Sequence, residues 1–134
     1  MDLLIGLMLA LVIGIATRGL GLDRDRALYP IVTMVIASYY LLFAVMAGST
    51  DALIADGVIA TGFVALAVAG FRINLWWVVA ALAAHGAMDA VHGHLVDNPG
   101  VPSWWPGFCG AYDIAAAGWL AWQLSIGRIP ARLA

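Results

Sequence analysis

Five long apolar runs, separated by short polar breaks, constrain the fold of this chain more than any other feature of its sequence. The runs cover residues 3–17, 27–47, 52–70, 75–94 and 107–126. Most of them approach the ~20 residues that a helix needs to cross a ~30 Å hydrocarbon core, and the first does so if it extends through residues 19–22. Only 10% of the residues are charged, against about a quarter in soluble domains. The sequence therefore predicts an all-α, polytopic membrane helix bundle of five transmembrane helices, forming a single domain over residues 1–134.

The arginines predict how this bundle is oriented. All basic residues are arginines, and they fall in the first break, in the third break and after the last run: Arg18, Arg24, Arg26, Arg72, Arg128 and Arg132. Five crossings put these three places on one side, which the positive-inside rule assigns to the cytoplasm. We therefore expect an inner-membrane, multi-pass protein with its N-terminus outside and its C-terminus in the cytoplasm. The net charge of −2 and the absence of a basic patch in the sequence exclude nucleic acid as an expected partner.

The fourth run ends in the polar stretch of residues 84–94, which holds all three histidines of the chain. His85, Asp89 and His92 are spaced i, i+4 and i+7, so their side chains fall within one narrow arc of a helix. Ionisable side chains inside a membrane helix indicate a functional site by default.

Two further aspartates are expected at a similar depth on neighbouring helices. At a rise of 1.5 Å per residue, Asp56, Asp89 and Asp113 each lie roughly 8–10 Å below the outer surface. No arginine can pair with them, because every arginine is on the cytoplasmic side. A lone buried carboxylate is costly, so each must be protonated, hydrated, paired with histidine or bound to a cation.

A divalent metal site is our leading interpretation of these residues. Imidazole and carboxylate ligands suit zinc or iron, and copper is a further option. The predicted ligands are His85, Asp89, His92 and Asp113. Asp89, His85 and Asp113 are also the predicted catalytic residues. The structural alternative is a hydrogen-bonded His–Asp network that holds the fourth helix against the third and fifth.

Other polar residues receive simpler interpretations. His94 lies off the arc and is expected in solvent, Asp56 is left open as a member of the site, and residues 97–100 are typical of a turn. A tyrosine in the middle of a membrane helix needs a partner for its hydroxyl, so Tyr39, Tyr40 or Tyr112 is expected to join the network. Residues 23–26 alternate Asp and Arg and predict a solvated cytoplasmic loop.

Three segments resemble small bacterial integral membrane proteins: LDRDRALYP at residues 22–30, ASYY at 37–40 and WWPGFCGAYD at 104–113. The resemblance extends over most of the chain. It implies no activity, cofactor or site residue.

The function that we infer from the sequence is metal-dependent hydrolysis or oxidation of a small or lipid-like substrate, near the periplasmic face. Two alternatives stay open. One is a proton-coupled transporter or channel subunit that uses the same Asp–His residues. The other is an accessory subunit of a larger membrane complex that binds haem or another pigment through His85. Because small residues are abundant in the apolar runs, a homo-oligomer is also a hypothesis.

Overall fold

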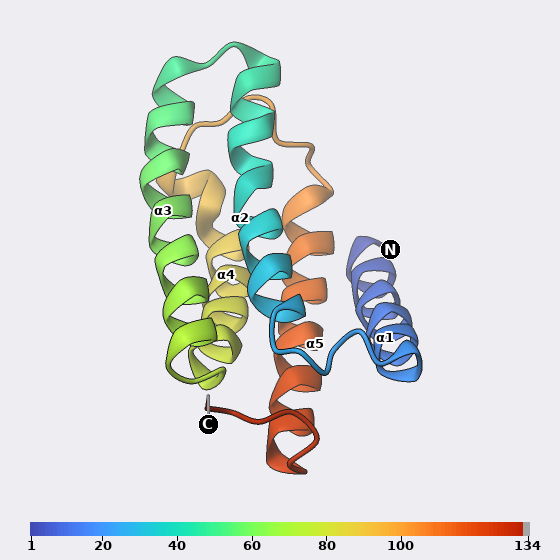
Figure 1. The fold of residues 1–134 in the computed structure, drawn as a ribbon. Helices are drawn as coiled ribbons and strands as arrows, with labels where there is room; N and C mark the ends of the chain where they lie inside the picture. Colours follow the sequence, from blue (N-terminus) through green and yellow to red (C-terminus); the bar gives the residue numbers. More distant parts are fainter. Residues whose placement is uncertain (133–134) are drawn as a thin grey trace.

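The computed structural model describes residues 1–132, and this range folds into five helices (Figure 1). The helices are α1 (Asp2–Leu20), α2 (Leu28–Ala47), α3 (Thr50–Arg72), α4 (Trp76–Leu95) and α5 (Trp105–Ser125). Each apolar run has become one helix, with ends that differ by a few residues from those predicted. The all-helical class is confirmed, and residues 1–132 contain no strand.

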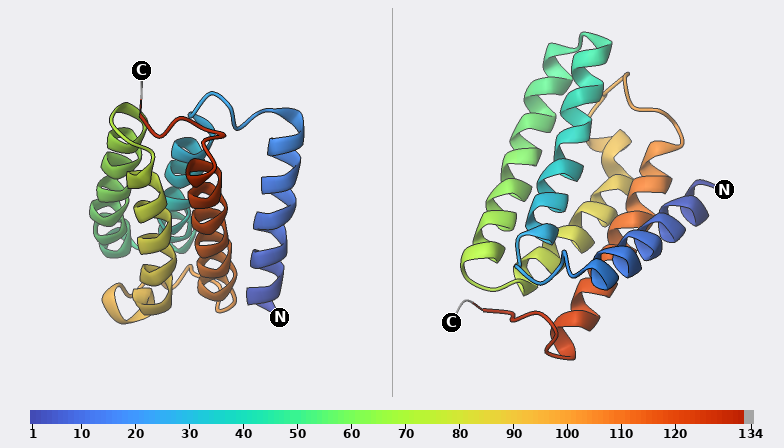
Figure 2. Two further views of the ribbon diagram at one scale, coloured as in Figure 1. Left: turned by 90° about the horizontal axis from the view of Figure 1, so that it is seen from below. Right: turned by 45° about the vertical axis from the view of Figure 1, so that its right-hand side comes forward.

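The helices form one row and one pair. Helix α5 lies in the middle of the row, with α4 on one side and α1 on the other (Figure 2, left). Helices α2 and α3 pack against each other and contact α4. Aromatic and aliphatic side chains of α2, α4 and α5 form the main core, among them Tyr40, Phe43, Leu82, Trp105 and Leu120. The helices that carry the predicted polar residues therefore meet in the middle of the molecule.

Local sequence explains where the helices end. Gly21 and Gly48 follow α1 and α2 with φ of 74° and 67°, a left-handed conformation that glycine adopts without the penalty of a Cβ. Helix α3 begins after Ser49, whose hydroxyl accepts a hydrogen bond from the backbone N–H of Ala52. Asp51 lies in the first turn of α3, where a negative charge interacts favourably with the helix dipole.

Three helices in the described part of the chain, α1, α2 and α3, are long and apolar enough to cross a membrane. Helices α4 and α5 carry the polar side chains of the candidate site. Large apolar side chains cover the outer surface of α1 to α3, for example Ile15 at 61% exposed and Val58 at 72%. A surface of this kind suits a hydrocarbon environment better than water.

The arginine-rich end of the bundle differs from the solvated loop that the sequence predicts. Asp23 is 0% exposed and Arg26 only 5%. Arg26 donates hydrogen bonds to the backbone carbonyls of Phe71 and Pro130, and Asp23 lies 3.7 Å from the guanidinium of Arg128. The prediction was wrong for these two residues because the segment after α5 folds back over the loop and covers them.

Candidate functional site

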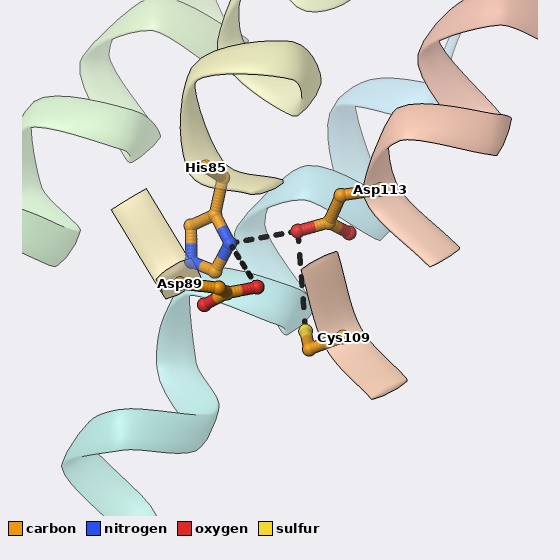
Figure 3. A group of neighbouring side chains, drawn as sticks. All are labelled: His85, Asp89, Cys109 and Asp113. Carbon is orange, nitrogen blue, oxygen red and sulfur yellow. Dashed lines mark hydrogen bonds and ion pairs between the residues drawn. The ribbon is translucent and has the colours of Figure 1, made fainter. Parts of the chain in front are cut away.

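Four polar side chains of α4 and α5 converge in the core (Figure 3). His85 Nδ1 is hydrogen-bonded to Asp113 Oδ2 at 2.8 Å and lies 3.7 Å from Asp89 Oδ2. Cys109 Sγ lies 3.9 Å from Asp113 Oδ2. All four side chains are buried. We call this group, His85, Asp89, Cys109 and Asp113, the His85 cluster.

Helical spacing and two glycines bring the cluster together. His85 and Asp89 lie one turn apart on α4, as do Cys109 and Asp113 on α5, so each helix presents two ligand-type side chains on one face. A Cβ atom on Gly86 would lie 2.9 Å from the carbonyl oxygen of Gly110, which is closer than real Cβ contacts come. The absence of side chains here lets the two backbones approach closely.

Tyr40 of α2 completes the surroundings of the cluster. Its hydroxyl donates a hydrogen bond of 2.7 Å to Asp89 Oδ1, in the core. Among the tyrosines that the sequence analysis expected to join the network, Tyr40 therefore does so. Within residues 1–132, the two remaining carboxylate oxygens of the cluster, Asp89 Oδ2 and Asp113 Oδ1, have no hydrogen-bond partner; we call them the open oxygens.

The open oxygens reflect an imbalance of donors and charges. The single Nδ1 of His85 faces two carboxylates, and its hydrogen bond goes to Asp113. If both carboxylates are ionised, an imidazolium neutralises only one of them. Burial makes each uncompensated charge and each unsatisfied oxygen costly. The cluster is therefore chemically suited to hold a cation or an additional proton.

The cluster has the composition of a transition-metal site. One ligand atom from each of the four residues lies within 4.8 Å of the corresponding atoms of the other three. Imidazole, thiolate and carboxylate are the ligands that zinc and iron use in proteins. A cation between these atoms would engage both carboxylates at once, and so it would compensate the charge that His85 cannot.

A second His–Asp pair lies farther along α4. His92 Nε2 is hydrogen-bonded to Asp56 Oδ1 of α3 at 2.8 Å. Asn98 donates to the other carboxylate oxygen of Asp56 at 2.8 Å and to the backbone carbonyl of Tyr40 at 2.9 Å. The imidazole of His92 also stacks on the Tyr40 ring, with centroids 3.8 Å apart. We call His92, Asp56 and Asn98 the His92 pair; both oxygens of its carboxylate are satisfied.

The structure groups the predicted ligands differently from the sequence analysis. His85, Asp89 and Asp113 come together, whereas His92 is bonded to Asp56 in the His92 pair. Asp56, which was left open as a member of the site, therefore belongs to this second group. His94 is exposed, as expected.

Two residues of these groups were not predicted in their observed roles. Cys109 is not among the ligands predicted from the sequence, although its i, i+4 spacing to Asp113 places the two on one face of α5. Asn98 was assigned to a turn. It does form the turn, since its side chain accepts from Gly100 N, but its amide nitrogen also donates into the core.

Comparison with known proteins found no match for this chain among protein-family models, curated proteins or solved structures.

Proposed function

We propose that this chain is a five-span membrane protein that binds one divalent metal ion in the His85 cluster. The observation that carries the proposal is the convergence of four buried ligand-type side chains, two of which hold the open oxygens. A structural network would satisfy its acceptors with the protein's own donors, whereas a metal ion would bind oxygens that these donors do not reach. The location of the open oxygens at this cluster favours the metal site over the structural alternative.

The donor set favours zinc or iron. A nitrogen, a sulfur and two carboxylates match the mixed ligand sets of zinc sites, and iron accepts the same ligands. A thiolate also binds copper, especially in its reduced state, so Cys109 keeps this metal as an option. In the His85 cluster, Cys109 takes the place of His92 among the predicted ligands, because His92 is bonded to Asp56.

A metal in this position would supply Lewis-acid chemistry or lower the pKa of a bound water. Metal-dependent hydrolysis or oxidation of a small or lipid-like substrate is the reaction class that we propose for it. The arginines that end α1 and α3 and follow α5 support an orientation with this end in the cytoplasm, in the inner membrane of a bacterial cell. The His85 cluster would then lie in the outer half of the bilayer.

Metal content tests the proposal. Protein purified in mild detergent should hold about one metal ion per chain, and both Asp89→Asn and Asp113→Asn should lose it. Asp56→Asn is the matched control, because Asp56 is also a buried carboxylate bonded to histidine at 2.8 Å. Circular dichroism and gel filtration would establish that each variant is folded. A wild-type protein that stays metal-free after incubation with zinc, iron and copper would overturn the proposal, as would unchanged metal content in folded Asp113→Asn.

Cobalt substitution tests the part of Cys109. A thiolate ligand gives Co²⁺ a charge-transfer absorption in the near ultraviolet, which should be present in the wild type and absent in Cys109→Ser. Retention of the band in this variant would show that the band does not come from a thiolate ligand, because the chain contains one cysteine, and it would remove Cys109 from the proposed ligands.

The proton-relay alternative rests on a different observation. Asp113, His85, Asp89 and Tyr40 form a continuous line of polar groups from α5 to α2, and such lines occur in transporters. Proton flux into liposomes that is lost on Asp89→Asn would favour this function.

The other alternative, a haem-binding accessory subunit, needs His85 as a ligand of the haem iron. The His85 ring would then have to leave its packing against the Phe63 ring, whose centroid is 4.7 Å away.

A further inference from the structure

A groove of about 650 Å³ runs along the face of α5 between α4 and α1. Figure 2 (left) shows α4 and α1 on either side of α5. Leu3 and Leu7 of α1 form one wall, Gly86, Asp89 and Ala90 belong to the other, and Ala111 and Ala115 lie on the α5 face. Its volume is in the range of cavities that bind small molecules. We call it the Asp89 groove.

Small residues create the groove. Gly107, Ala111 and Ala115 recur every fourth residue on α5, and Gly86, Ala90 and Gly93 recur every third or fourth residue on α4. This spacing places each set along one helix face. Larger side chains at these positions would fill the space between α4 and α1. By itself, such a stripe would be explained by helix packing.

Asp89 distinguishes this groove from an ordinary packing defect. The residue lines the groove but is only 2% exposed, and its Oδ2 is one of the open oxygens. A Cβ atom on Gly110 would lie 3.8 Å from this buried oxygen, so the oxygen lies directly behind Gly110, which itself lines the groove. A carboxylate oxygen in an apolar groove is costly unless the occupant donates a hydrogen bond to it.

We propose that the Asp89 groove binds a single-chain amphiphile whose head group, a hydroxyl or a primary amine, donates a hydrogen bond to Asp89 Oδ2. The alkyl chain would lie along Leu3, Leu7 and Ile114. Such an amphiphile would be the substrate class of the proposed metal site, because Asp89 belongs to both the His85 cluster and the Asp89 groove. Any reaction of the head group therefore rests on the proposed function. Binding itself requires only the groove and the carboxylate.

A second copy of the chain fits the groove less well. A two-fold symmetric dimer across it would turn the two Asp89 carboxylates toward each other, and like charges repel strongly away from water. Each copy would also present the same acceptor, Asp89 Oδ2, so neither oxygen would gain a hydrogen-bond donor.

Photolabelling tests the proposal in metal-free protein. The protein would be placed in lipid nanodiscs with EDTA and exposed to photoreactive analogues of dodecanol and dodecylamine, with the methyl ether of the alcohol as a probe that lacks the donor. Mass spectrometry should map the label to residues 3–7 and 107–115. The ether should label these segments about tenfold less, which is the loss expected for one hydrogen bond. Labelling by the amine alone would support the proposal and restrict the head group to a cation.

Two variants fill the groove without changing the His85 cluster. Ala111→Leu and Ala115→Leu should each reduce labelling at least tenfold while metal content stays at the wild-type level. Ala65→Leu is the matched control, because Ala65 is exposed on α3, away from the groove. Equal labelling by ether and alcohol, or labelling spread over all lipid-facing helices and unchanged in both filled variants, would overturn the proposal. Metal content measured on the same samples separates this failure from a failure of the metal site.

Discussion

Helix α4 carries two buried histidines, His85 and His92, each hydrogen-bonded to an aspartate on a neighbouring helix at 2.8 Å. The two environments differ in how the carboxylates are satisfied. Around His92, Asp56 receives one hydrogen bond on each oxygen, from His92 and from Asn98. Around His85, two carboxylates face one ring nitrogen. The open oxygens, Asp89 Oδ2 and Asp113 Oδ1, receive no hydrogen bond from any residue in 1–132.

Under the proposed function, this difference separates a contact that holds the fold together from a site that binds a ligand. A satisfied polar group stabilises the helix arrangement, and the protein loses stability when one partner is removed. An unsatisfied group lowers stability, and proteins keep such groups where function requires them. The His92 pair fits the first description and the His85 cluster fits the second.

The largest expected effect comes from the same substitution in the two environments. Asp56→Ala removes the acceptor of His92 and one of the two acceptors of Asn98, and loss of a partner from a buried pair costs about 3–5 kcal/mol. Asp113→Ala should cost about 1 kcal/mol or less in metal-free protein. Asp89 Oδ2 lies 3.7 Å from His85 Nδ1 and can accept its hydrogen bond in place of Asp113. The substitution also removes one of two neighbouring carboxylates, which repel each other when both are ionised. Unfolding by SDS in mixed micelles with EDTA, followed by circular dichroism, measures both. Equal losses would contradict the distinction.

Two glycines allow each environment to be disturbed separately. In Gly86→Ala, the new Cβ meets the Gly110 carbonyl at 2.9 Å and pushes α4 from α5 beside the His85 cluster. In Gly100→Ala, the new Cβ collides with the Phe43 carbonyl and displaces the turn that holds Asn98. Overpacking of this kind costs about 1–3 kcal/mol in either case.

The readouts of these two variants should differ. Gly86→Ala should weaken metal binding and shift the imidazole NMR signals of His85, whereas Gly100→Ala should shift those of His92 and leave metal content unchanged. The chain has three histidines, and exposed His94 provides an internal reference. Loss of metal in both variants would show that the two environments are one unit.

Much of the fold follows from patterns within single segments. Apolar runs of about 20 residues predict helices, and His85 and Asp89 share a face because they are one turn apart. The need of a buried tyrosine hydroxyl for a partner also predicted that one of three tyrosines would join the network, and Tyr40 does so. Each of these inferences concerns one helix and its own periodicity. Whether all five helices cross the membrane stays a prediction, since α1, α2 and α3 are the ones with the length and hydropathy to do so in the described residues.

Only the separation of His85 from His92 could be derived in this way, since the rest of the ligand grouping depends on how helices meet. His92 lies on the same face as His85, but seven residues along a helix correspond to about 10 Å. One ion therefore cannot bind both. Cys109 enters the cluster because Gly86 and Gly110 bring α5 close to α4, and Asn98 reaches Asp56 because a turn directs its side chain into the core. These contacts between elements have no periodic signal in the sequence.

Tyr40 connects the two environments, and its removal gives the smallest and most specific expected effect. Its hydroxyl donates to Asp89, while its ring stacks on His92. Tyr40→Phe removes the first contact and keeps the second. Loss of one buried hydrogen bond should cost about 1 kcal/mol of stability, and loss of a residue that orients a ligand should weaken metal binding about tenfold.

Tyr40→Leu is the matched comparison, because it removes both the hydroxyl and the stacking ring. In Tyr40→Phe, the His92 NMR signals should stay in place while the metal dissociation constant rises, and in Tyr40→Leu both should change. If Tyr40→Phe instead moved the His92 signals as far as Tyr40→Leu does, the hydroxyl would couple the two histidines. Asp89, Tyr40 and His92 would then form one coupled network, which is the arrangement that the relay function requires and the metal site does not.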